Sequence, residues 1–261
     1  MDNHSDARRH MVISDPQVKP GGSIKHLGWA AQAVVEYKPD VLVLIGDWWD
    51  LPSLSKHEPI GSMHLEGSRL QADIDAGNEA MRYFCEPIER ERDRLVKGKR
   101  KHWDLDAHIT FGNHEWRLQR TISADPKMDG VLTIDALKTP AWIKRHPFLE
   151  IVQIDGIKYC HYFANPLSGK PIGGTIHNRL GHIGSSFVQG HQQGFLYASK
   201  QYPDHVKHGV VCGRFYKEHE HYRPDDVQRS EWNGIVVLNQ VHDGDFDIMP
   251  LRYDYLERKY G

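Results

Sequence analysis

Residues 11–45 read MVISDPQVKPGGSIKHLGWAAQAVVEYKPDVLVLI. Two continuous apolar runs, 11–14 and 41–45, flank a segment over 24–37 in which apolar residues recur at helical spacing. Continuous apolar runs are typical of strands that are buried on both faces, and Pro39 stands where the helix should end. The order of strand, helix and parallel strand therefore predicts an α/β fold.

The same kind of pattern continues along the chain. We expect a long helix over 66–95, a third short strand over 107–111 and a helix over 116–122. Later segments are typical of hairpins: 151–162, with Asp155-Gly156 as the turn, and 234–251, with its turn near Gly244. Short strands are also predicted at 187–189 and 209–211. No linker composition interrupts the chain, so residues 1–261 are predicted to form a single domain.

The composition excludes several classes of protein. The 261 residues carry 33 Lys and Arg against 35 Asp and Glu, a net charge of −2, whereas a protein that coats DNA is normally strongly basic. The three cysteines have no C-x-x-C spacing, which favours a reducing compartment. No apolar run approaches the roughly 20 residues that a membrane helix needs. We therefore expect a soluble cytoplasmic protein without a membrane partner.

Residue types that bind metal ions follow directly after several predicted strands. These segments are Asp15-Pro-Gln17, Gly46-Asp-Trp-Trp-Asp50, Gly112-Asn-His-Glu115, His161 and Gly190-His-Gln-Gln193. In an open α/β sheet, ligands bind beyond the carboxyl ends of the strands, so these side chains should converge there. A mixed set of oxygen and nitrogen ligands suits divalent first-row metal ions.

In this order, the five segments resemble the signature of the calcineurin-like metallophosphoesterase superfamily, which runs D-x-H, GDxxD, GNH(D/E), H and GHxH. The match extends from Asp15 to Gln193. The resemblance implies an α/β sandwich of two mixed sheets flanked by helices, with 1–261 as one metallophosphoesterase domain that hydrolyses phosphoesters. The chain also resembles members of the superfamily that bacteriophages carry, which would place it in the cytoplasm of an infected host cell.

The resemblance also implies a set of metal ligands. One ion would be held by Asp15, Gln17, Asp47 and Gln193, and the other by Asp47, Asn113, His161 and His191, with Asp47 bridging. Gln17 and Gln193 stand where the signature has histidine, and both belong to the first ion. An amide oxygen is a neutral but harder ligand than imidazole, which favours Mn²⁺ or Mg²⁺ over Zn²⁺ at this position. We expect two divalent metal ions, with Mn²⁺ favoured. The alternative is an empty first position.

The family mechanism implies a role for two more residues. In that mechanism, two divalent metal ions would lower the pKa of a water molecule and so supply a hydroxide nucleophile for the phosphorus atom. The histidine of GNH(D/E), here His114, would protonate the leaving oxygen as the general acid, and Asp50 would orient its imidazole. Glu115 completes the motif and receives no role from the sequence.

Three classes of function stay open at this stage. A phosphodiesterase or nuclease that acts on DNA or nucleotides is favoured, because Leu51 stands where the Ser/Thr protein phosphatase branch has arginine and because a basic cluster lies at 97–101. A phosphomonoesterase is the first alternative, with Lys170 as the cation for the dianion. A metal-stabilised binding module without hydrolytic activity is the second alternative.

Other residues near the signature have weaker predictions. Trp48 and Trp49 are expected to pack in the core rather than to stack on bases. The basic cluster 97–101 is expected to be a solvated connection, with contact to nucleic acid as the alternative. Histidines in the loop 51–67 would overhang the site, and those of 218–221 could supply additional ligands if this segment is a strand.

Overall fold

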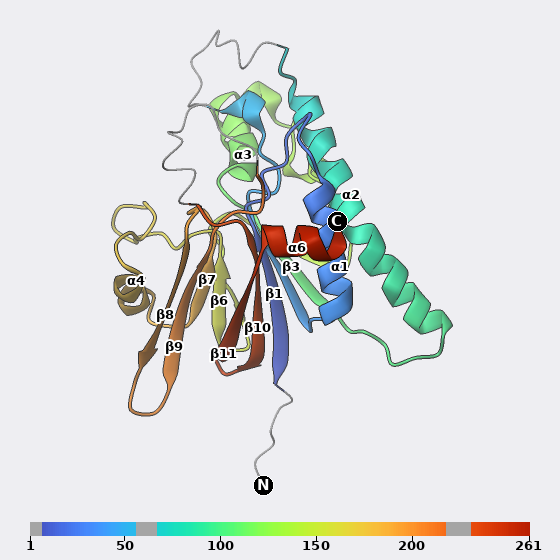
Figure 1. The fold of residues 1–261 in the computed structure, drawn as a ribbon. Helices are drawn as coiled ribbons and strands as arrows, with labels where there is room; N and C mark the ends of the chain where they lie inside the picture. Colours follow the sequence, from blue (N-terminus) through green and yellow to red (C-terminus); the bar gives the residue numbers. More distant parts are fainter. Residues whose placement is uncertain (1–6, 56–66, 218–230) are drawn as a thin grey trace.

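Two β-sheets form the centre of the protein, and helices cover their outer faces (Figure 1). The computed structural model describes residues 7–55, 67–217 and 231–261. Within them, the first sheet has the order β11-β10-β1-β2-β3-β4 and the second has the order β5-β6-β7-β9-β8. Each sheet combines parallel and antiparallel pairs. The predicted α/β fold with two mixed sheets is therefore confirmed.

The strands of the first sheet are β1 (Arg8–Ser14), β2 (Val41–Ile45), β3 (Asp106–Thr110), β4 (Ile143–His146), β10 (Gly234–His242) and β11 (Asp245–Arg252). Those of the second sheet are β5 (Val152–Ile154), β6 (Ile157–Cys160), β7 (Phe187–Gln189), β8 (Phe195–Gln201) and β9 (Val206–Cys212). Both predicted hairpins are present, with turns at Asp155-Gly156 and Asp243-Gly244. The sequence did not predict β4 and β8, which are edge strands.

The helices are α1 (Lys25–Tyr37), α2 (Leu70–Lys97), α3 (Glu115–Ala124), α4 (Ile176–Ile183) and α6 (Tyr253–Tyr260). The predicted helices 24–37, 66–95 and 116–122 correspond to α1, α2 and α3. Helix α4 packs on the second sheet, and α6 packs against α1. No helix in the described ranges is both long and apolar enough to cross a membrane.

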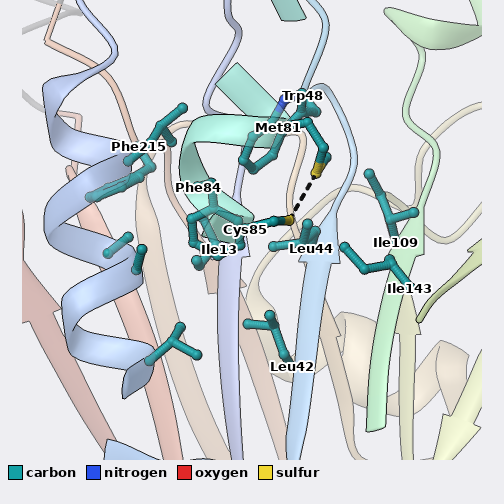
Figure 2. Packing of buried hydrophobic residues seen from close by; sticks show 14 of the residues in the cluster. Ile13, Leu42, Leu44, Trp48, Met81, Phe84, Cys85, Ile109, Ile143 and Phe215 are labelled. Carbon is teal, nitrogen blue, oxygen red and sulfur yellow. Dashed lines mark hydrogen bonds between the residues drawn. The ribbon is translucent and has the colours of Figure 1, made fainter. Parts of the chain in front are cut away.

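The central strand β2 explains why its sequence is a continuous apolar run. Leu42 and Leu44 belong to the core between this sheet and the helices, and Figure 2 shows Leu44 near Cys85 of α2. Val43 and Ile45 point to the opposite face and pack between the sheets. Because both faces of β2 are covered, polar side chains occur only after its carboxyl end, in the turn that follows the strand.

Candidate metal centre

The turns after β1, β2, β3, β6 and β7 meet at one edge of the two sheets, as the sequence predicted. Asp15, Gln17, Asp47 and His191 in these turns have positive φ angles, between 42° and 67°. Non-glycine residues rarely adopt this left-handed region, and such strain is concentrated at functional sites. The tight turns bring short polar side chains together directly beyond the strand ends.

Two glycines allow the turns to approach one another. A Cβ atom on Gly112 would lie 2.1 Å from Oδ1 of Asp47, and one on Gly190 would lie 2.4 Å from Oδ2 of Asp15. Any side chain at these positions would displace a predicted metal ligand. The glycines of the GNHE and GHQQ segments are therefore required by the close packing of the turns.

The four residues predicted for the second metal ion lie together. One ligand atom from each of Asp47, His161 and His191 lies within 4.8 Å of the other two. Oδ1 of Asn113 is 2.8 Å from Nδ1 of His191 and 3.0 Å from Nε2 of His161. Oδ2 of Asp47 is 3.3 Å from the same Nε2. This arrangement of nitrogen and oxygen atoms fits a divalent metal ion.

The electrostatics of His161 favour a cation at this position. Its Nδ1–H donates to the carbonyl of Ile45 at 3.2 Å, which directs Nε2 towards the oxygens of Asp47 and Asn113. Burial opposes a charge on His161, but the carboxylates of Asp47 and Asp15 raise its pKa to about 10. Burial and the neighbouring His161 lower the pKa of His191 to about 4, so His191 is neutral near pH 7. In the metal-free protein, a proton on His161 supplies the positive charge that this site attracts.

Two residues predicted for the first metal ion have buried oxygens without a partner among the described residues. Oδ2 of Asp15 accepts hydrogen bonds from the hydroxyl of Ser14 and, at 3.0 Å, from the backbone N–H of His191. Oδ1 of Asp15 and Oε1 of Gln17 are buried and accept no hydrogen bond from the described residues. Buried acceptors without donors are costly, so a cation bound by both oxygens would relieve that cost. Burial and the nearby Asp47 raise the pKa of Asp15 to about 7.

Gln193, the remaining predicted ligand of this ion, has protein donors instead. Its Oε1 accepts from the hydroxyl of Tyr216 at 3.0 Å and lies 3.4 Å from Nη1 of Arg214. The Arg214 guanidinium also pairs with Glu231 at 3.0 Å and lies 4.4 Å above the ring of Tyr216. The positive charge of the Arg214 guanidinium beside the amide oxygen of Gln193 disfavours binding of a metal ion to that oxygen. The role of Gln193 as a ligand stays a prediction.

The predicted His114–Asp50 pair is formed. Nδ1 of His114 lies 2.7 Å from Oδ1 of Asp50, and its Nε2 lies 3.6 Å from Oδ2 of Asp47. Burial opposes a charge on His114, but Asp47 and Asp50 raise its pKa overall. The imidazole therefore lies beside the predicted metal ligands and can hold a proton near neutral pH.

Arg117, which received no role from the sequence, is buried beside this pair. Its Nη2 is 3.0 Å from Nε2 of His114, and its Nη1 donates to the carbonyl of Asp50 at 2.8 Å. Arg117 lies three residues after His114, at the start of α3. Because residues three apart lie on the same face of a helix, this spacing was the available signal.

Glu115 connects two of the turns through its carboxylate. Oε2 accepts from the backbone N–H groups of Gly112 at 2.7 Å and Asp47 at 3.0 Å. Oε1 accepts from those of Trp48 at 2.6 Å and Trp49 at 3.0 Å. The side chain is fully buried. One carboxylate therefore fixes the backbone that carries Asp47.

The remaining predictions have mixed outcomes. Trp48 and Trp49 are buried in the core, as expected. The cluster 97–101 is exposed where α2 ends, in agreement with a solvated connection. Lys170 is exposed in the loop after β6. Residues 56–66, with His57 and His64, and the histidines of 218–221 lie outside the described residues.

The fold and the site together define an α/β protein with a candidate metal centre at the carboxyl ends of its parallel strands. No protein-family model matches the chain, and no curated protein is similar to it. Among solved structures, it is similar to a mutant of Vps29 from Entamoeba histolytica, with 10% identity, a TM-score of 0.34 and coverage of 94% of this chain and 99% of that one.

Two further structures are similar to the same degree. TT1561 of Thermus thermophilus has 11% identity and a TM-score of 0.34, with 94% of this chain and 100% of that one covered. YfcE, described as a phosphoesterase from E. coli, has 12% identity and a TM-score of 0.36, with 94% and 99% covered. These scores do not assign an activity to the chain.

Proposed function

We propose that the protein is a divalent-metal-dependent phosphoester hydrolase that acts on phosphodiesters. The observation that carries the proposal is the distance of 3.6 Å between Nε2 of His114 and Oδ2 of Asp47. At this distance, a group that can give a proton would act next to the proposed metal ligands at one edge of the sheets. A site that only bound a metal ion would not need a paired imidazole at this position.

Different residues of the site would have different roles in the proposed hydrolysis. Bound divalent metal ions would neutralise phosphate charge and lower the pKa of a water molecule. Asp47, Asn113, His161 and His191 would hold one ion, and Asp15 and Gln17 the other. His114 would protonate the leaving oxygen from Nε2, while Asp50 stabilises the imidazolium through Nδ1. The positive charge of Arg117, whose Nη2 lies 3.0 Å from the same Nε2, opposes a proton on His114 and so limits its pKa.

The positions of cationic side chains favour a diester over a monoester as the substrate. Leu51 is buried where a phosphatase arginine would stand, and Lys170 lies on an exposed loop. A phosphodiester carries one negative charge less than a monoester dianion and needs less compensation. Nucleotides and DNA are the natural compounds of this class that we propose as substrates.

The first experiment compares hydrolysis of bis-p-nitrophenyl phosphate and p-nitrophenyl phosphate with Mn²⁺. We expect faster turnover of the diester and loss of activity when EDTA removes the metal ion. Re-addition of Mn²⁺ should restore it. Preference for the monoester would replace the proposal with a phosphomonoesterase, and binding of Mn²⁺ without turnover of either ester would indicate a binding module.

Calorimetric titration with Mn²⁺ should show two binding steps of different affinity. We expect Gln17→Met to remove only the weaker step, whereas Lys19→Met, on the same turn, should leave both. Because the pKa of His161 is about 10, the stronger step should release a proton and its affinity should rise with pH, by about tenfold per unit below pH 10. A single step up to millimolar Mn²⁺ would contradict the two-metal site.

A further inference from the structure

A cavity with aromatic walls lies beside Glu115, the residue that accepts a hydrogen bond from the backbone of Asp47. Its volume is about 400 Å³, and its lining includes Phe111, Trp116, Gln119, Asp135, Arg145 and Phe148. We call this set the aromatic pocket. Glu115, which fixes the backbone of Asp47, also lines it. The volume falls in the range of small-molecule sites, roughly 300–1,000 Å³.

A row of aromatic rings connects the aromatic pocket to a metal ligand. The rings of Trp116 and Phe148 stack with centroids 5.7 Å apart, and Phe148 meets Tyr162 edge to face at 5.5 Å. Tyr162 in turn lies 4.8 Å from the ring of His191. The three aromatic residues come from α3, the segment after β4 and the segment after β6, so only the fold brings them together.

Trp116 is an unusual member of this row because 42% of its surface is exposed. Buried tryptophans elsewhere in the protein, such as Trp48 and Trp49, pack in the core and use their N–H groups inside it. The exposed indole of Trp116 offers a flat face for stacking. Stacking on aromatic side chains is how proteins bind unpaired bases.

The polar members of the aromatic pocket suit the edge of a base. Gln119 has an amide that can both donate and accept, Asp135 has acceptor oxygens, and Arg145 has donors. Arg145 is held in place over the ring of Phe111, at 5.1 Å, and by Asp135 at 3.2 Å. Bases carry donors and acceptors on a flat rim, so aromatic walls with polar groups at their edge match this shape.

We propose that the aromatic pocket binds the base of a nucleoside whose phosphodiester lies at the metal centre. The inference rests on the proposed function and names its substrate class: nucleotide diesters and single-stranded nucleic acid. The base would stack on Trp116, and the row through Phe148 and Tyr162 would guide the sugar and phosphate towards His191. A paired duplex does not present a free base face, so an unpaired nucleotide is the form that fits.

The test compares two esters with the same leaving group. Wild-type protein with Mn²⁺ should hydrolyse thymidine 5′-(p-nitrophenyl phosphate) with a higher kcat/KM than ethyl p-nitrophenyl phosphate, which has no base. Trp116→Ala should lower kcat/KM for the thymidine ester by about 5- to 150-fold, the usual effect of removing one base-stacking partner. The ethyl ester should change less than about twofold, which also shows that the variant is folded. Trp116→Phe should retain most of the preference.

Binding without metal provides an independent measurement. In EDTA, the dinucleotide thymidylyl-thymidine should quench the tryptophan fluorescence of wild-type protein but not that of Trp116→Phe. Equal kcat/KM values for the two esters, or equal losses for both in Trp116→Ala, would overturn the inference and leave the proposed function standing. Quenching at Trp116 without hydrolysis of any diester would retain the pocket and contradict the proposed function.

Discussion

Replacement of His114 by glutamine should lower the turnover of thymidylyl-thymidine by about 10²- to 10⁴-fold, the range expected when a general acid is lost. In this substrate the leaving group is an alkoxide, which departs only if it is protonated. Nδ1 of His114 is fixed by Asp50 at 2.7 Å, so its Nε2 is the atom that delivers the proton. The measurement is kcat at saturating Mn²⁺, together with the Mn²⁺ affinity.

The leaving group provides the control for this prediction. Nitrophenolate is stable as an anion, so hydrolysis of bis-p-nitrophenyl phosphate should decrease much less in His114→Gln than that of the dinucleotide. Mn²⁺ affinity should stay close to that of the wild type, because His114 is not among the predicted ligands. Equal losses with both substrates, or a loss of Mn²⁺ binding, would show that His114 supports the metal centre and does not protonate the leaving group. Asp50→Asn should show a weaker form of the same pattern.

Replacement of Glu115 by alanine should lower the free energy of unfolding by about 3–5 kcal/mol. The carboxylate accepts four buried backbone N–H groups, and its removal leaves all four without their acceptor. An unsatisfied buried donor costs about 1–3 kcal/mol, and water that enters the space left by the side chain reduces the sum. Urea unfolding of the metal-free protein in EDTA measures the change.

Two further variants separate this effect from a general loss of charge. Glu115→Gln keeps the shape but places an NH₂ group against backbone donors, so it should also destabilise the protein. Glu150→Ala removes a single surface pair with His146, so it should change the free energy of unfolding by less than about 1 kcal/mol. Because Glu115 fixes the turn that carries Asp47, Mn²⁺ should also bind more weakly to Glu115→Ala. A loss below about 1 kcal/mol would mean that solvent replaces the carboxylate at these N–H groups.

Much of the architecture follows from local sequence pattern. Apart from Ser14 at the end of the first run, the apolar runs 11–14 and 41–45 have no polar residue to place on a solvated face, so they fit interior strands. The same reasoning fails for β4 and β8. These edge strands carry mixed side chains, and most of β8 is exposed, so their pairing is decided by the neighbouring strand.

The candidate site shows the same division. The sequence alone determined which residue types follow the strand ends, and the rule that strand ends converge predicted that these segments meet. The family resemblance assigned Asp47, Asn113, His161 and His191 to one ion, and the structure brings the four side chains together. Only the tertiary structure decided which donors surround Gln193, that Arg117 and Glu115 support the turns, and that Trp116, Phe148 and Tyr162 form one row. The position of a strand end follows from the pattern of apolar and polar residues within a short stretch of sequence. Contacts between distant segments depend on how the sheets and helices pack, and no local pattern contains that information.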